Sequence, residues 1–196
     1  MRSRAKLLDA ATELLTEGGS RAVTVDAVAE RSGVAKSTMY RHFASQTELL
    51  VAVLRHNLPH LDFEVSDGSF EDDVRSVVHA IASLMTDPDW VRILPALMSL
   101  RMAIPDIDDL AKAEYDAQLG QIQRLVDKGI EAGLLPTDTD LITTMSLLAG
   151  PLMHITLNND VERLTKLADE VAGRYIASCL HWSGPSADGM GTAQGQ

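Results

Sequence analysis

The chain has 196 residues, of which 45% are hydrophobic and 4% aromatic, and its formal net charge is -11 at pH 7. This apolar content suffices for one large domain or two smaller ones, while uncharged stretches such as 147–157 are shorter than the roughly 20 residues that a bilayer span requires. The single cysteine, Cys179, excludes an internal disulfide. No secretory leader is recognisable at the start, so we expect a cytoplasmic protein.

The charge differs sharply between two parts of the chain. Residues 1–58 hold 8 Lys and Arg against 6 Asp and Glu, a balance of +2, whereas residues 59–196 hold 9 against 22, a balance of -13. Affinity for duplex DNA comes largely from neutralised phosphates, so the net charge alone argues against nucleic acid. Physiological salt screens charges beyond about 8 Å, however, so a basic first part can meet DNA while a distant acidic part does little to repel it.

Apolar residues recur at helical spacing, and the alternation typical of strands is nearly absent. The spacing predicts a first helix at about 4–17, which ends at Gly18-Gly19. Thr24 can cap a second helix, which ends where Gly33 permits the positive φ of a tight turn. A third helix follows over about 35–43. This short segment of three helices has the layout of a helix-turn-helix.

Further signals predict six more helices. Ser45 and Glu48 form a capping box that starts a fourth helix, which runs to about Leu58 with Pro59 after it. The other five begin at Phe70, at Pro88, at Pro105, after Pro136-Thr137 and at Asp160, and the last three of these end near Gly133, Asn158 and Trp182. Residues 183–196 include four glycines and no apolar periodicity, so we expect a disordered tail.

The third predicted helix carries the strongest functional signal. Ala35, Met39 and Phe43 follow one another at i, i+4 and i+8 and share one side. The other side presents Ser37, Tyr40, Arg41 and Ala44, and Lys36 adds a charge at the start. Such a helix can enter the major groove, with phosphate favoured near its N-terminus. From periodicity alone, an ordinary helix pair with a solvated polar face is the alternative.

The order of residues favours the DNA-binding interpretation. The run TVDAVAERSGVAKSTMYRHF over 24–43, followed by ASQTELL over 44–50, closely resembles the DNA-binding signature of the TetR/AcrR family. Gly33-Val34, Tyr40, His42-Phe43 and the Ser45 cap occur together at the spacing of that family. The resemblance covers the first four helices, and it is weaker in the later segments 131–136 and 148–153.

The resemblance implies an all-α, nine-helix TetR-like fold. It implies an N-terminal three-helix helix-turn-helix head at 1–46, with the helix-turn-helix at about 24–43. A helical ligand-binding and dimerisation body would occupy 47–182, ahead of the tail at 183–196. The partners it implies are an inverted-repeat operator in double-stranded DNA, a second copy of the chain and a small-molecule effector. The two reading helices of the dimer would lie about one DNA turn, roughly 34 Å, apart.

The resemblance also implies roles for individual side chains at the DNA. Thr24 would donate to a phosphate, and Tyr40 and His42 would hold phosphates. Four residues of the third helix would touch bases or backbone: Lys36, Ser37, Thr38 and Arg41. Gln46 stands where lysine is common in the family, and because glutamine releases no counterion, we expect a weaker phosphate contact there.

An apolar seam on the last two predicted helices suggests a dimer interface. Three-four spacing of apolar residues is typical of packed helices, and two such helices from each protomer would form a four-helix interface. The seam comprises Leu141, Met145, Leu148, Leu152, Val161, Leu164, Ala168, Val171 and Tyr175, and Ser178 and Trp182 continue it. A core stripe within one chain is the alternative.

Adaptable side chains on the fifth to eighth helices suggest a pocket for an apolar or amphipathic effector. They are Met85, Trp90, Met98, Met102, Tyr115, Met145, Met153 and His154. Ordinary core packing is the alternative for each of them. For His79 and His154, a satisfied imidazole competes with a role as donor to a ligand.

Signals for an enzyme are missing from the sequence. It has no Gly-rich phosphate loop and no serine elbow, and His56 and His60 lack a third metal ligand. We therefore expect no catalytic site, no metal and no cofactor. The sequence indicates a ligand-responsive transcriptional repressor that binds its operator as a homodimer and is released by the effector. A TetR-like activator and a non-enzymatic helical small-molecule-binding protein are the alternatives, and a nucleoid-type binder would need basic residues spread over its surface.

Overall fold

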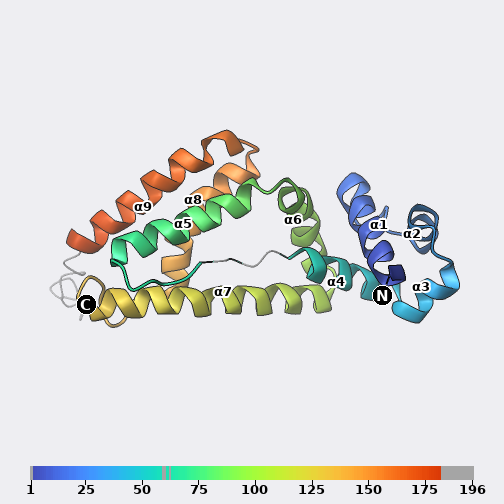
Figure 1. Cartoon of the computed structure of the whole chain (residues 1–196), viewed down its shortest axis with the longest axis horizontal. Helices are drawn as coiled ribbons and strands as arrows, with labels where there is room; N and C mark the ends of the chain where they lie inside the picture. Colours follow the sequence, from blue (N-terminus) through green and yellow to red (C-terminus); the bar gives the residue numbers. More distant parts are fainter. Residues whose placement is uncertain (1, 59–60, 62, 182–196) are drawn as a thin grey trace, which may run out of the picture.

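The computed structural model describes residues 2–58, 61 and 63–181, and these form nine α-helices and no strand. Figure 1 shows a helical head at one end and a larger helical body along the long axis. The helices are α1 (Arg2–Gly18), α2 (Val25–Ser32), α3 (Lys36–His42), α4 (Gln46–Asn57), α5 (Phe70–Thr86), α6 (Pro88–Arg101), α7 (Pro105–Glu131), α8 (Leu141–Leu157) and α9 (Leu164–His181), with a 3-10 turn at Val161–Arg163. The prediction of an all-α, nine-helix fold is confirmed.

Local capping positions the helices of the head. The Thr24 hydroxyl accepts a hydrogen bond from Ala27 N at 3.2 Å, and Gly33 ends α2 with φ of +65°. Ser45 Oγ accepts from Glu48 N at 3.1 Å. The Glu48 carboxylate accepts from Ala44 N at 2.6 Å, one residue before the backbone group that a capping box would use. These contacts fix the short α3 between two defined turns.

Two later boundaries differ from the predictions. The eighth helix was expected directly after Pro136-Thr137, but it begins at Leu141, where the Asp140 carboxylate accepts from Thr143 N at 2.7 Å. The ninth helix was expected from Asp160, and a 3-10 turn precedes α9 there. Pro59, His60, Trp182 and the predicted tail at 183–196 lie outside the described residues.

Two hydrophobic clusters make up the interior. The head cluster joins α1–α4 to α6 and to the start of α7, where Ile107 is fully buried. The body cluster joins α5, the second half of α7, α8 and α9. In Figure 1, α7 runs along the body while α6 stands beside the head. The head therefore packs on α6 and α7 and is not merely tethered to the body.

The apolar seam predicted for dimerisation lies inside the protomer. Leu148, Leu152, Leu164 and Ala168 have no exposed surface in the single chain, and Met145, Val171 and Tyr175 are 5% to 8% exposed. Leu141 and Val161 are half-buried against the same cluster. Side chains enclosed within one chain cannot contact a second copy, so the structure contradicts a dimer contact for these seven buried residues and leaves it open for Leu141 and Val161. The alternative of an intrachain core stripe describes these seven residues.

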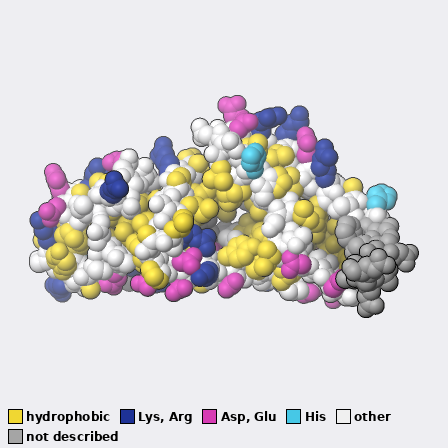
Figure 2. Space-filling model, turned by 180° about the vertical axis from the view of Figure 1, so that it is seen from behind, with side chains coloured by type: hydrophobic (Ala, Val, Ile, Leu, Met, Phe, Trp, Pro, Cys, Tyr) yellow, Lys and Arg dark blue, Asp and Glu magenta, His cyan; other side chains and the backbone are white. Residues whose placement is uncertain are grey.

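No described helix is both long and apolar enough to cross a membrane. Among the described residues, no group of His, Cys, Asp and Glu side chains could hold a metal ion. Figure 2 shows one face of the molecule, with hydrophobic side chains gathered around a hollow near its middle.

Candidate DNA-binding surface and effector cavity

The exposed side of α3 carries the side chains predicted to contact DNA. Met39 and Phe43 are 1% and 2% exposed and anchor the helix in the head cluster. Tyr40 is 55% exposed in spite of its size, and four other predicted contacts on α3 are also exposed or half-buried: Ser37, Thr38, Arg41 and His42. A rigidly anchored helix thus presents hydroxyl groups and a cation to solvent. We call the side chains of Thr24, Ser37, Thr38, Tyr40, Arg41 and His42 the reading surface.

Thr24 is exposed at the N-terminus of α2. Its oxygen accepts the capping hydrogen bond, and because a hydroxyl group can also donate, its O–H remains available to a phosphate. One side chain can therefore both cap the helix and contact DNA.

Two predicted contacts have partners within the chain. Lys36 Nζ forms an ion pair with Asp26, whose hydrogen bond raises the pKa of the lysine. Gln46 Nε2 donates to Val23 O at 2.6 Å and so connects α4 to the turn before α2. In the free chain, one N–H of each side chain is therefore bonded to a partner within the chain. The other N–H donors of the Lys36 ammonium and of the Gln46 amide remain for DNA.

Other cations of the head differ in availability. Arg31 on α2 pairs with Glu13 at 3.1 Å and Glu17 at 2.9 Å, and the hydrogen bonds to these carboxylates raise its pKa. Arg4 is exposed, with its guanidinium 5.6 Å from the centre of the Phe43 ring. Arg4 therefore lies beside the end of α3. This contact was not predicted, because the two residues are far apart in the chain.

A cavity of about 190 Å³ lies among α5, α6, α7 and α8, next to the residue that follows α4. Five of the eight predicted effector residues line it, namely Met85, Trp90, Tyr115, Met145 and Met153. Seven further lining residues were not predicted: Leu58, Leu61, Ile81, Leu84, Glu114, Gln118 and Ala149. The structure thus brings together most of the predicted pocket.

Three predicted effector residues do not line this cavity. Met98 and Met102 are 45% and 91% exposed, and His154 is exposed on the outer side of α8. His79 also lies at the surface, where Nε2 is 2.9 Å from the Asp169 carboxylate. The structure therefore does not bring Met98, Met102, His154 or His79 to this cavity. Neither histidine is a buried imidazole.

The cavity is built from both hydrophobic clusters. Trp90 belongs to the head cluster, Met85 and Met145 belong to the body cluster, and Met153 packs against both. Leu58, which directly follows α4, also lines the cavity. A molecule in the cavity would therefore touch the end of the helix that connects head and body.

Comparison with known proteins identifies both parts of the chain. Residues 7–53 match the family described as bacterial regulatory proteins, tetR family, and residues 65–176 match the tetracyclin repressor-like C-terminal domain. The chain belongs to the TetR family. Proteins of this family bind DNA and small-molecule ligands, and the family is non-enzymatic, which confirms that this TetR-family chain is not an enzyme.

Individual relatives of this TetR-family chain are distant. The uncharacterized HTH-type transcriptional regulator YdeS of Bacillus subtilis is 27% identical over 179 residues, which cover 87% of this chain and 82% of that protein. The HTH-type transcriptional repressor KstR of Rhodococcus jostii is 27% identical over 173 residues, covering 87% and 78%. The solved structure of Salmonella enterica GusR superposes with a TM-score of 0.73 over 91% of this chain and 95% of that chain, at 17% identity, which shows the shared fold.

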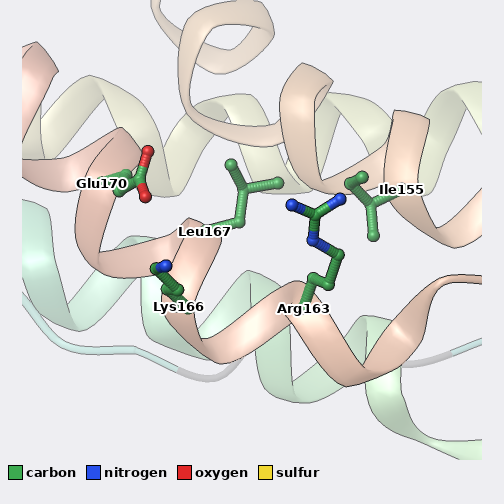
Figure 3. Close-up of a pocket in the computed structure, with 5 residues that line it drawn as sticks. All are labelled: Ile155, Arg163, Lys166, Leu167 and Glu170. Carbon is green, nitrogen blue, oxygen red and sulfur yellow. The ribbon is translucent and has the colours of Figure 1, made fainter.

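The outer face of α8 and α9 in this TetR-family chain is partly apolar. Ile142, Leu147, Leu157 and Leu180 are 54% to 60% exposed. Between these helices, Figure 3 shows Arg163 lying between Ile155 and Leu167 in a shallow pocket that Lys166 and Glu170 complete. This outer face, and not the buried seam, is available to a second copy of the chain.

Proposed function

We propose that this TetR-family regulator is a repressor, which binds an inverted-repeat operator as a homodimer and leaves it when a small effector fills the cavity. The reading surface carries the proposal, because a helix anchored by two buried side chains exposes hydroxyls, an aromatic hydroxyl and a cation together. In this proposal residues 1–46 form the DNA-binding head and 47–182 the effector-binding and dimerisation body. The protein would act in the cytoplasm, where its operator lies.

Repression is proposed over activation because of the similarity to a repressor, KstR, along most of the chain. The DNA-binding surface serves either outcome equally. What differs is the position of the operator relative to the promoter.

Each predicted DNA contact has a chemical role in the proposal. Thr24, Tyr40 and His42 contact phosphates, while Ser37, Thr38 and Arg41 face base edges or the backbone. Lys36 leaves Asp26 for the DNA, where a stronger field of phosphates competes for the ammonium. Gln46 contacts a phosphate only weakly, because one N–H of its amide donates to Val23 O and the neutral amide releases no counterion.

The outer face of α8 and α9 supports the homodimer. Gly150 and Gly173 lie inside these helices, where glycine is less favourable than alanine by about 1 kcal/mol. A Cβ atom at either position would meet nothing within 4 Å in the single chain. Close approach of a partner helix would explain both glycines. Apolar burial would come from Leu147 and Leu157 nearby.

The cavity supplies the coupling between effector and DNA. Its wall includes Leu58 at the end of α4 and Trp90 of the head cluster. A ligand that fits only one placement of α4 and α6 against the body shifts the population toward that placement. If the distance between the two copies of α3 in that placement does not match the spacing of the operator half-sites, the dimer leaves the DNA.

Substitution of Arg41 tests the DNA-binding part of this proposal. Genomic fragments retained by the purified dimer supply the operator, and gel shifts against random duplex measure the preference. Arg41→Ala should weaken operator binding at least about fivefold, since one good base contact contributes about 1–3 kcal/mol. Arg75→Ala removes an equally exposed arginine from α5 and should leave binding unchanged. Equal losses in both variants, or none in Arg41→Ala, would contradict the reading surface.

A further inference from the structure

The first turn of α1 carries cations that helix stability does not explain. It contains Arg2 and Arg4, both exposed, and no acidic residue. The positive end of the helix dipole lies in this turn, so a cation there is unfavourable for the helix by itself. An anionic partner outside the chain would make this placement favourable.

A contact with the residue that follows α3 fixes the position of Arg4. Its guanidinium carbon Cζ lies 5.6 Å from the centre of the Phe43 ring, within the range of a cation–π contact. Phe43 is 2% exposed and belongs to the head cluster, so the ring is itself held in place. Because the ring is neutral, the contact positions the guanidinium without cancelling its charge.

The same ring lies next to predicted phosphate contacts. The centre of the His42 ring is 6.3 Å from that of Phe43, and the His42 side chain is exposed. Along the chain, Phe43 stands between His42 and Gln46, which are both predicted to contact phosphate. Arg4 therefore lies beside residues that the proposed function assigns to the DNA backbone. Gln46 brings no charge to this part of the head, and Arg4 supplies one.

The charge of Arg4 is not neutralised within the described part of the chain. Lys36 and Arg31 are bound by carboxylates of α1 and α2. No carboxylate of the described residues lies within 4.0 Å of the Arg4 guanidinium. Glu48, in the first turn of α4, accepts a hydrogen bond from Ala44 N instead. A phosphate that binds Arg4 therefore displaces no described carboxylate.

We propose that Arg4 of each protomer is a further DNA contact, whose guanidinium binds a backbone phosphate beside the one that His42 contacts. This inference rests on the proposed function for the orientation of the head on DNA and for the homodimer. A guanidinium can bond a phosphate through two N–H groups at once, and phosphate contacts position a protein without reading sequence. Arg4 thus strengthens binding to any duplex and extends the contact from α3 to α1.

The salt dependence of DNA binding tests this contact. Fluorescence anisotropy on the selected operator and on random duplex, from about 50 to 200 mM salt, gives the slope of log affinity against log salt concentration. Each neutralised phosphate contributes about 0.9 to this slope, and a dimer has two copies of Arg4. Arg4→Ala should therefore lower the slope by about two on both DNAs, so that wild type loses about tenfold more affinity than the variant over this range. An unchanged slope in Arg4→Ala would overturn the inference.

Further variants separate a phosphate contact from mere support of α3. Arg4→Lys keeps the charge and should keep the wild-type slope, whereas Arg4→Gln keeps N–H donors without the charge and should behave as Arg4→Ala does. Arg55→Ala removes an exposed arginine from the last turn of α4, at the end away from Gln46, and should leave the slope unchanged. Weaker operator binding by Arg4→Gln at an unchanged slope would assign Arg4 to support of α3 alone and would overturn the inference.

The inference and the proposed function can fail separately. If wild type prefers its operator and Arg4→Ala keeps the wild-type slope, the proposed function stands and Arg4 is not a DNA contact. If wild type prefers no site, the proposed function is contradicted, while a lower slope of Arg4→Ala on random duplex would still support the phosphate contact.

Discussion

Asp73 is the one charged residue that is fully buried among those the structure describes. Its Oδ1 accepts hydrogen bonds from Ser66 N at 3.0 Å and Ser66 Oγ at 2.8 Å, and Lys128 Nζ pairs with Oδ2. Burial acts to raise the pKa of Asp73, but the hydrogen bonds from Lys128 and Ser66 outweigh it and hold the pKa below its usual value. This ion pair ties the start of α5 to the end of α7.

Asp73→Asn should therefore destabilise the fold by about 1–3 kcal/mol, because it removes the charged hydrogen-bond partner of Lys128, whose side chain is only partly buried. A carboxyl whose pKa is lowered by folding stabilises the native state above its unfolded pKa of about 3.9. That stabilisation disappears as the pH falls through the folded pKa.

Urea denaturation at fixed protein concentration measures this effect. The difference between wild type and Asp73→Asn should stay constant from about pH 5 to 8 and shrink below about pH 4. Asp116→Asn, on the exposed side of α7, serves as control and should change stability little at any pH. A wild-type advantage that persisted unchanged at low pH would contradict the assignment.

The reading surface was predictable residue by residue because its signals are local in sequence. Tyr40 and Arg41 face outward on a short helix whose buried side, Met39 and Phe43, follows from spacing alone. The Lys36–Asp26 pair and the approach of Arg4 to Phe43 depend on how α1, α2 and α3 pack. No pattern within a single helix contains that information.

At the scale of helices, strong caps were predicted well and ambiguous ones poorly. α5 begins at Phe70, its predicted first residue, where the Ser69 side chain caps the helix. Before α8, Thr137, Asp138 and Asp140 are all capping residue types, and the sequence does not distinguish among them. The structure selects Asp140.

The seam on α8 and α9 shows a second limit of helical periodicity. Spacing identified the buried side of both helices correctly, as Leu148 and Ala168 show. It does not identify what covers that side. α5 of the same chain packs against the buried sides of both helices. A dimer interface on these helices would therefore use the outer sides of α8 and α9.

Ala177→Glu tests the outer side of α9. Ala177 is exposed in the single chain, so the substitution should leave the fold intact. In a symmetric interface it places two like charges near each other, and we expect light scattering to report a monomer at concentrations where wild type is dimeric. Ala113→Glu on the exposed side of α7 is the matched control and should remain dimeric. A stable dimer of Ala177→Glu with wild-type affinity would rule out this face.

For the whole molecule, the distribution of charge and core explains how an acidic protein can bind DNA. The balance of +2 in residues 1–58 belongs to the head, at the far end from most of the acidic body. The head shares its hydrophobic cluster with α6, and the cavity lies where that cluster meets the body cluster. A change in the cavity can thus reach α3 through packed side chains.

The central claim is that two copies of α3 read a symmetric DNA site. Hydroxyl-radical footprinting of the wild-type dimer on its selected operator tests this most directly. The account predicts two protected patches related by a two-fold axis, about one DNA turn or roughly 34 Å apart, both lost in Arg41→Ala. Protection without two-fold symmetry, or equal protection of random duplex, would contradict it.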